Sequence, residues 1–177
     1  GEIVAVPGVD LARDESIRDT TTIEALAGLK PLFASDGTGT VTAGNASPIN
    51  DGASAVLLAG EGVLPGEPLA RIAGRASFGV DPDQFPIAPI EAANRALARA
   101  GRTWADVDLV ELNEAFASQA LACLAGWTDL DPEKLNVHGG ALAIGHPLGA
   151  SGGRIIGRAA HALAAQGGGV AVVAICI

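Results

Sequence analysis

"VDLVELNEAFASQALACLAG", residues 107–126, begins as a short apolar run and continues with apolar side chains at helical spacing. The pattern predicts a strand over 107–112 and a helix over 113–126. The reverse order follows near the end of the sequence, where 150–167 has helical spacing and 168–177 is a strand-like run of buried type. Alternation of strands and helices is typical of an α/β fold.

Towards the N-terminus the sequence predicts one further helix with clear end signals. Residues 89–101 place apolar side chains at helical spacing, with Pro89 at the start and Gly101 after the end. The remaining predicted elements are a short peripheral helix within 19–31 and strand-like runs at 40–44, 55–60 and 69–80, with a turn-rich stretch at 45–54.

Composition narrows the class of protein. The chain has 177 residues, 49% of them hydrophobic, and a formal net charge of −9, which argues against nucleic acid or an anionic membrane surface as a partner. The longest apolar run, 170–177, is too short to span a bilayer, and the start lacks the basic region of a signal peptide, so we expect a cytoplasmic protein. Cys123 and Cys176 form no CxxC motif, so we expect free thiols in a reducing compartment. Both ends, Gly1 and Ile177, look cut from a longer sequence.

"NVHGGALAIGHPLGASGGR", residues 136–154, concentrates glycine and two of the three histidines ahead of the last predicted helix. It has neither GxGxxG spacing nor the lysine of a P-loop, so a phosphate-binding loop is excluded. His138 and His146 lack the spacing of known metal motifs, so no metal site is expected, and we expect structural roles for His138 and His161. A catalytic turn and simple close packing both stay open on these residues alone.

Three side chains are candidates for acyl-transfer chemistry. Asn113 and Cys176 follow predicted strands, at the carboxyl edge where α/β sheets bind ligands, and His146 lies in a Gly-His-Pro turn that would aim its imidazole. Each also has an ordinary alternative: a helix N-cap, a small core thiol and a buried, hydrogen-bonded histidine. Together they would supply an oxyanion donor, a general base and a second acid/base.

Four segments resemble signature motifs of the thiolase family, in the family's order. They are "TVTAGNASPINDGASAVLLAG" at 40–60, "NEAFA" at 113–117, "NVHGGALAIGHPLGASGGRI" at 136–155 and "ICI" at 175–177. The resemblance covers nearly the whole chain. It implies acyl transfer between coenzyme A thioesters through an acyl-cysteine, either thiolytic cleavage of a 3-ketoacyl-CoA or condensation of two acetyl-CoA molecules.

The resemblance also implies a role for each candidate. His146 would activate the nucleophilic cysteine, Asn113 would share with it, through a water, the hole for the thioester oxygen as the enolate forms, and Cys176 would be the second acid/base. The family's other oxyanion hole uses a backbone N–H that would follow Ile177. No residue here matches the nucleophile, since Cys123 falls within a predicted helix, so this chain alone is expected to be inactive. The alternative is a non-catalytic thiolase-like subunit that binds lipid or completes a partner.

Coenzyme A would enter as a substrate rather than as a permanently bound cofactor. By resemblance, Ala43 and Ser47 would lie beside the pantetheine arm, Phe116 at the acyl end and Arg18 near the nucleotide. Pro48 replaces a glycine usual in the family and would restrict the backbone beside the pantetheine. "FPIAPIEA", at 85–92, resembles the variant of acetoacetyl-CoA thiolases, which favours short acyl chains.

The fold implied by the resemblance is a thiolase-like α-β-α-β-α layering with mixed five-stranded sheets, here mainly the C-terminal core domain. Residues 1–38 would be the tail of a loop domain, 39–64 the last part of the N-terminal core domain, and 65–177 most of the C-terminal core domain, without its final glycine-rich segment. We expect the full-length parent to be a homodimer or homotetramer. On its own, the chain should expose apolar surface and dissolve poorly.

Overall fold

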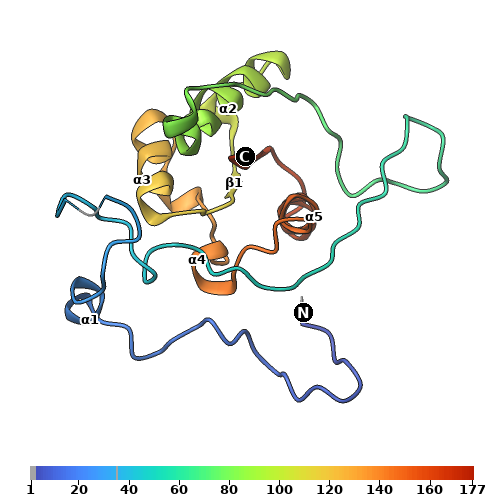
Figure 1. Ribbon diagram of the computed structural model, residues 1–177. Helices are drawn as coiled ribbons and strands as arrows, with labels where there is room; N and C mark the ends of the chain where they lie inside the picture. The colour runs from blue at the N-terminus through green and yellow to red at the C-terminus, as the bar shows by residue number, and fades with distance from the viewer. Residues whose placement is uncertain (1–2, 35) are drawn as a thin grey trace.

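A parallel pair of strands lies at the centre of the computed structural model, which describes residues 3–34 and 36–177 (Figure 1). Strand β1 (Leu109–Leu112) pairs with β2 (Ala171–Ala174) in register along all four residues of each. Parallel neighbours need a long crossover connection, because the chain must return to the same end of the sheet. Here the crossover contains α3 (Ala117–Gly126), η3 (Pro132–Lys134), α4 (Ala141–Ile144) and α5 (Ser151–Ala165).

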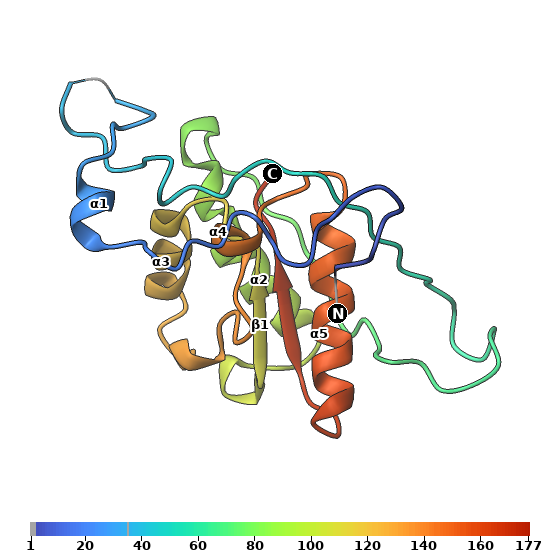
Figure 2. The ribbon, with the colours of Figure 1, turned by 90° about the horizontal axis from the view of Figure 1, so that it is seen from below.

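Helices cover both faces of this sheet, and the predicted α/β class is confirmed. Helices α2 (Ala88–Arg99) and α3 pack on one face, and α5 packs on the other (Figure 2). The larger core lies on the α2–α3 side, where Val110, Leu112, Val172 and Ala174 contact buried side chains of both helices. The α5 side is smaller and is built on Leu109, Ala159 and Leu163.

Two tryptophan side chains pack in the larger core, on the α2–α3 side of the sheet. Trp127, which follows α3, is almost fully buried and donates its indole N–H to the Ile90 carbonyl at 3.2 Å. Its ring lies 4.9 Å from that of Trp104, in η2 (Trp104–Asp106). The two rings therefore fix the ends of α2 and α3 relative to each other.

The predicted helices are present, with corrected bounds. Helix α2 starts one residue before Pro89, and α5 lies within 150–167. Helix α3 begins at Ala117 rather than at residue 113, because Asn113 continues the line of β1 and donates its N–H to the Ala174 carbonyl at 2.9 Å. The predicted strand at 168–177 is limited to β2, since Gly167, Gly168 and Gly169 form a turn with positive φ.

The N-terminal half contains little regular structure. Helix α1 (Ile23–Ala27) confirms the predicted peripheral helix, and the Thr22 side chain caps it by accepting from the Ala25 N–H at 3.1 Å. The strands predicted at 40–44 and 55–60 are wrong for this structure: the first has a single bridge, Pro31 to Thr42, and the second is extended and exposed. Extended chain becomes a strand only beside a hydrogen-bonded neighbour, and the described residues give 55–60 none.

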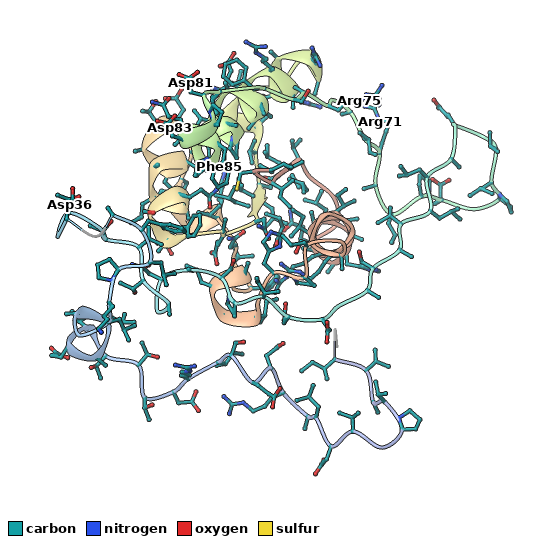
Figure 3. The ribbon with its side chains drawn as sticks, viewed as in Figure 1. Asp36, Arg71, Arg75, Asp81, Asp83 and Phe85 are labelled. Carbon is teal, nitrogen blue, oxygen red and sulfur yellow. The ribbon has the colours of Figure 1, made fainter. Side chains whose placement is uncertain are left out.

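The strand predicted at 69–80 is likewise absent from this stretch of the structure. Its residues from 74 to 80 alternate between half-buried and exposed, and they lie along α2 before η1 (Pro82–Ile87). Arg99 donates to the Arg75 carbonyl at 2.7 Å, and the Arg95 guanidinium lies 4.5 Å from the centre of the Phe78 ring. Figure 3 shows Arg71 and Arg75 projecting away from the core along this stretch. It therefore has the side-chain pattern of a strand without a partner strand.

Two of the five strands expected for a thiolase sheet are thus formed within residues 3–34 and 36–177. In this same part of the chain no helix has both the length and the apolar character needed to cross a membrane.

Candidate active site

Asn113 directly follows β1 and is completely buried. Its backbone N–H is bonded to Ala174, yet neither polar atom of its side chain has a hydrogen-bond partner among the described residues. The N-cap alternative is wrong, because α3 begins after Phe116. A buried amide without a partner costs about 1–3 kcal/mol, so this side chain is placed for a water or a ligand.

The turn that carries His146 is held from outside by the segment 48–54. Helix α4 ends at Ile144 and is followed by Gly145, whose φ is +85° and whose missing Cβ leaves room for the Asn50 side chain. Asn50 donates to the Ile144 carbonyl at 2.8 Å, and the His146 N–H donates to the Pro48 carbonyl at 2.8 Å. The backbone that leads into His146 is therefore fixed at two points.

The imidazole itself is oriented by Ser151, in the first turn of α5. Its Nδ1 lies 2.6 Å from the Ser151 Oγ, and that fully buried hydroxyl donates to the Pro147 carbonyl at 3.2 Å. In the tautomer that carries its proton on Nδ1, the Ser151 oxygen accepts that proton and the single hydroxyl proton is directed at Pro147. The lone pair of His146 is then on Nε2, the nitrogen a general base would use.

Burial shifts the titration of all three sulfur and imidazole groups. It lowers the pKa of His146, and the positive charge of Arg154 lowers it further. Burial raises the pKa of Cys176, and raises that of Cys123 to about 11. At neutral pH the imidazole is therefore a free base and both cysteines are protonated thiols. Cys123, inside α3, is unsuited to be a nucleophile.

The segment 46–48 brings the predicted site residues of different elements together. Ser47 donates both its N–H and its hydroxyl to the Ala115 carbonyl, at 3.0 and 3.2 Å. Ala46 forms a β-bridge with Phe116, and the next residue but one, Pro48, contacts His146. Phe116 also packs edge-to-face on Phe33, with ring centres 5.9 Å apart. The segment therefore links the chain after Asn113 to the turn that carries His146.

Cys176 reaches the same edge of the sheet by another path. It lies two residues beyond β2 and is buried, and the backbone bond between Asn113 and Ala174 aligns the two strand ends. The register therefore places Asn113 and Cys176 at the same, carboxyl, edge of the sheet.

Ala43 and Arg18 lie further from this centre. Ala43 is an exposed turn residue between Thr42 and Asn45, next to a groove of ≈ 490 Å³ formed by α1 and residues 39–45. Arg18 is exposed, in the extended segment before α1, where its carbonyl accepts from Thr21. The structure does not bring Arg18 to the three catalytic candidates.

Neither of the other histidines joins the site. His138 and His161 are both exposed. The His138 backbone has a structural role, since Arg158 donates to its carbonyl at 2.7 Å and to that of Gly139 at 3.0 Å. Over residues 3–34 and 36–177, no group of three or more His, Cys, Asp or Glu side chains is placed to hold a metal ion.

Sequence reasoning missed several polar residues that hold the site. They are Asn50, Glu114, Asn136, Ser151 and Arg154, all of them inside or next to the quoted motifs. A signal was available, since each is a polar side chain within a stretch of glycine and small apolar residues. Their partners, however, lie up to 94 positions away in the sequence, as for Asn50 and Ile144.

The family models match both halves of the chain. Residues 66–177 match the thiolase C-terminal domain, and residues 2–62 match the thiolase N-terminal domain. The chain is 48% identical over 169 residues to the cytosolic acetyl-CoA acetyltransferase of Mus musculus, and 50% identical over 167 residues to the mitochondrial 3-ketoacyl-CoA thiolase of Homo sapiens. Each match covers 93% of this chain and 42% or 41% of the relative, so the chain spans about two fifths of the length of these proteins.

Solved structures of thiolases have the same fold as this chain. Human mitochondrial 3-ketoacyl-CoA thiolase in complex with CoA superposes with a TM-score of 0.82 at 46% identity, covering 94% of this chain and 42% of that one. The acetyl-CoA acetyltransferase of Bacillus anthracis gives a TM-score of 0.83 at 42% identity, covering 93% of this chain and 42% of that one. The thiolase-like fold expected from the sequence is confirmed, and the chain belongs to the thiolase family.

Proposed function

We propose that the protein containing this chain transfers acyl groups between coenzyme A thioesters through an acyl-cysteine. The observation that carries the proposal is the hydrogen-bond chain from His146 through Ser151 to Pro147, which in the Nδ1-protonated tautomer leaves Nε2 of a neutral imidazole free to accept a proton. The names of the relatives, acetyl-CoA acetyltransferase and 3-ketoacyl-CoA thiolase, support this class of reaction.

In the proposed mechanism, His146 removes the proton of a cysteine that is not among these 177 residues. The thiolate attacks the thioester carbonyl, an acyl-cysteine forms, and coenzyme A leaves with a proton. Asn113 donates, through a water, to the thioester oxygen while the enolate exists, which would satisfy its unpartnered amide. Cys176 exchanges the α-proton, and its raised pKa supports the protonated form that acts as an acid in the cleaving direction.

Coenzyme A is proposed to approach along the residues that join the two parts of the site. The segment that carries Ser47 is bonded to the one that carries Phe116, just after Asn113. The groove next to Ala43 would extend the coenzyme A path away from the reacting centre. Pro48 is compatible with this path, because its carbonyl, rather than an N–H, makes the contact to His146. We further propose that the acyl group of the substrate is short and that Arg18 contacts the nucleotide of coenzyme A.

The wider context is also proposed. The segments 1–38, 39–64 and 65–177 would belong to a loop domain and to the N- and C-terminal core domains, and the complete protein would form a homodimer or homotetramer. The two cysteines are free thiols, which supports a reducing compartment such as the cytoplasm.

The test is His146→Ala in the product of the complete reading frame. Loss of the base should lower kcat for cleavage of acetoacetyl-CoA by about 10³-fold or more, with little change in thermal stability. His161→Ala is the matched control, because His161 is exposed on α5. Full thiolysis by the His146 variant would refute the assigned role.

A further inference from the structure

Asn136 lies beside the chain segment that carries Asn113 and bonds to both of its neighbours. Its Oδ1 accepts from the Leu112 N–H at 2.9 Å, and its Nδ2 donates to the Leu112 carbonyl at 2.9 Å. The same Nδ2 donates to Oε1 of Glu114 at 2.7 Å. One side chain thus holds the residues immediately before and after Asn113.

Glu114 extends these contacts to the helix that precedes His146. Its Oε2 accepts from the Leu142 N–H, in α4, at 3.1 Å. The carboxyl group occupies the space that a Cβ at Gly140 would need. Glu114 therefore connects the end of β1 to α4, whose last residue is followed directly by the Gly-His-Pro turn.

Asn136 has a left-handed backbone conformation, which few residues other than glycine adopt readily. Its φ is +47°, in the left-handed region, and the residue is 8% exposed. Asparagine tolerates that region better than most side chains, but it still costs energy compared with ordinary backbone. Its N–H also donates to the Val110 carbonyl at 2.8 Å, so Asn136 is bonded along the edge of β1 through both backbone and side chain.

Fixing the backbone here has a direct consequence for Asn113. Because its amide has no hydrogen bond of its own to the described residues, the direction of that amide depends on where the backbone holds it. The Ala174 carbonyl fixes that backbone on the side of β2. Asn136 and Glu114 fix it on the opposite side.

We propose that Asn136 and Glu114 are positioning residues, which hold the Asn113 amide in the orientation needed to stabilise the thioester enolate. The inference rests on the proposed function, in which Asn113 acts during enolate formation and not during acylation of the cysteine. The two steps can be measured separately in the complete enzyme. Exchange of the α-protons of acetyl-CoA with D₂O reports on the enolate, and release of coenzyme A on mixing with acetyl-CoA reports on acylation.

Asn136→Asp is the main variant. It keeps the shape of the side chain but places an oxygen where Nδ2 meets the Leu112 carbonyl and the Glu114 carboxylate. We expect α-proton exchange to fall about 10- to 100-fold and the acylation rate to change by no more than about threefold. Glu114→Gln replaces one of the two accepting oxygens by an NH2 group and so removes one of the two hydrogen bonds; it should lower exchange in the same selective way by a smaller factor.

The double variant Asn136→Asp with Glu114→Gln reverses donor and acceptor. The new amide at position 114 can then donate to the new carboxylate at position 136, while the carbonyl of that amide accepts from the Leu142 N–H. We expect the double variant to exchange α-protons about five- to tenfold faster than Asn136→Asp alone. Glu133→Gln is the matched control, since it removes the same charge from an exposed residue three positions before Asn136.

Asn113→Ala separates the failure of this inference from that of the proposed function. If Asn113→Ala leaves exchange unchanged, the proposed role of Asn113 is wrong, and the positioning role with it. If Asn113→Ala lowers exchange but the single variants at 136 and 114 do not, or lower both steps equally, only the positioning role is overturned. Should Asn136→Asp fail to fold, Glu114→Gln decides the same question, because either a selective loss or its absence can be read from it alone.

Discussion

At the scale of single residues, His146 is controlled in backbone direction, in ring orientation and in charge. Its backbone is bonded to Pro48, its Nδ1 to Ser151, and its charge is opposed by burial and by Arg154. The first two contacts set direction and tautomer, and the last two keep the ring neutral. A general base needs all of these properties at once.

The lowered pKa of His146 predicts an effect of pH on stability. Its ordinary value is 6.5, and the folded protein holds it lower, so below pH 6.5 the unfolded chain binds a proton that the folded one resists. This contribution to the free energy of unfolding is present above pH 6.5 and is lost as the pH falls towards the folded pKa. Denaturant titrations at several pH values should show the decline, and His146→Gln should reduce it.

The variant Arg154→Gln should raise the pKa of His146, because the Arg154 charge lowers that pKa in the parent protein. Without the positive charge the imidazolium is less disfavoured, so the acidic limb of the kcat/KM profile should move to higher pH. No hydrogen bond of Nε or Nη1 to the described residues is lost in this variant. Arg102→Gln, at an exposed site, is the control. An unchanged limb, or one moved to lower pH, would contradict the assigned electrostatics.

The three catalytic candidates could be predicted from the sequence because each stands at a place that topology alone marks. Asn113 and Cys176 follow strands, and His146 lies between glycine and proline. The residues that orient them could not be found this way, since Ser151 and Asn136 act through contacts that exist only after the glycine-rich turn folds back on β1 and α5. The N-cap alternative for Asn113 failed because α3 begins only at Ala117, and the Asn113 side chain accepts from no N–H of that helix among the described residues.

At the scale of elements, the glycine-rich stretch is a set of close approaches rather than a flexible loop. Gly140 faces Glu114, Gly145 faces Asn50, and Gly153 faces Ser54, whose hydroxyl donates to the Ala150 carbonyl at 2.6 Å. Each approach brings another segment against α4 or α5. The two alternatives left open by the sequence, packing and catalysis, therefore describe the same feature, because the packing is what places His146.

Gly140→Ala should be destabilising, since its Cβ would overlap the Glu114 carboxyl group. We expect a loss of about 1–3 kcal/mol in the free energy of unfolding. Gly149→Ala, where a Cβ meets nothing within 4 Å, should stay within about 0.5 kcal/mol of the parent. Chemical denaturation of both variants measures the difference. Equal stabilities would show that the Glu114 side chain moves aside at little energetic cost.

Helices were predicted better than strands for a physical reason. A helix satisfies its own backbone, so apolar spacing and end signals located α2 and α5 to within a few residues. A strand depends on a neighbour that can be anywhere in the protein. The side-chain alternation at 74–80 was therefore real, although it did not produce a strand.

At the scale of the whole molecule, the exposed apolar surface expected for this chain is confirmed. Large apolar side chains in the N-terminal half face outward, with Leu57 82% and Leu58 67% exposed. They lie on the part of the chain that loops away from the sheet in Figures 1 and 2. Surfaces of this kind are normally covered by other protein.

The isolated polypeptide 1–177 should therefore aggregate and show no thiolase activity. Light scattering coupled to size-exclusion chromatography and an acetoacetyl-CoA cleavage assay test both statements. The product of the complete reading frame, prepared in the same way, is the positive control. Turnover by the purified 177-residue chain would contradict the proposal that the nucleophile lies elsewhere.

The parallel pairing of β1 and β2 also has a consequence for the order of folding. Every residue of the crossover, including Asn136 and His146, lies between two strands that meet only after a long loop has closed. Closing such a loop is entropically costly and slow compared with forming a local helix. We expect α3 and α5 to form early and the sheet late, so that the bond from the Asn113 N–H to the Ala174 carbonyl is among the last native contacts to appear as the protein folds.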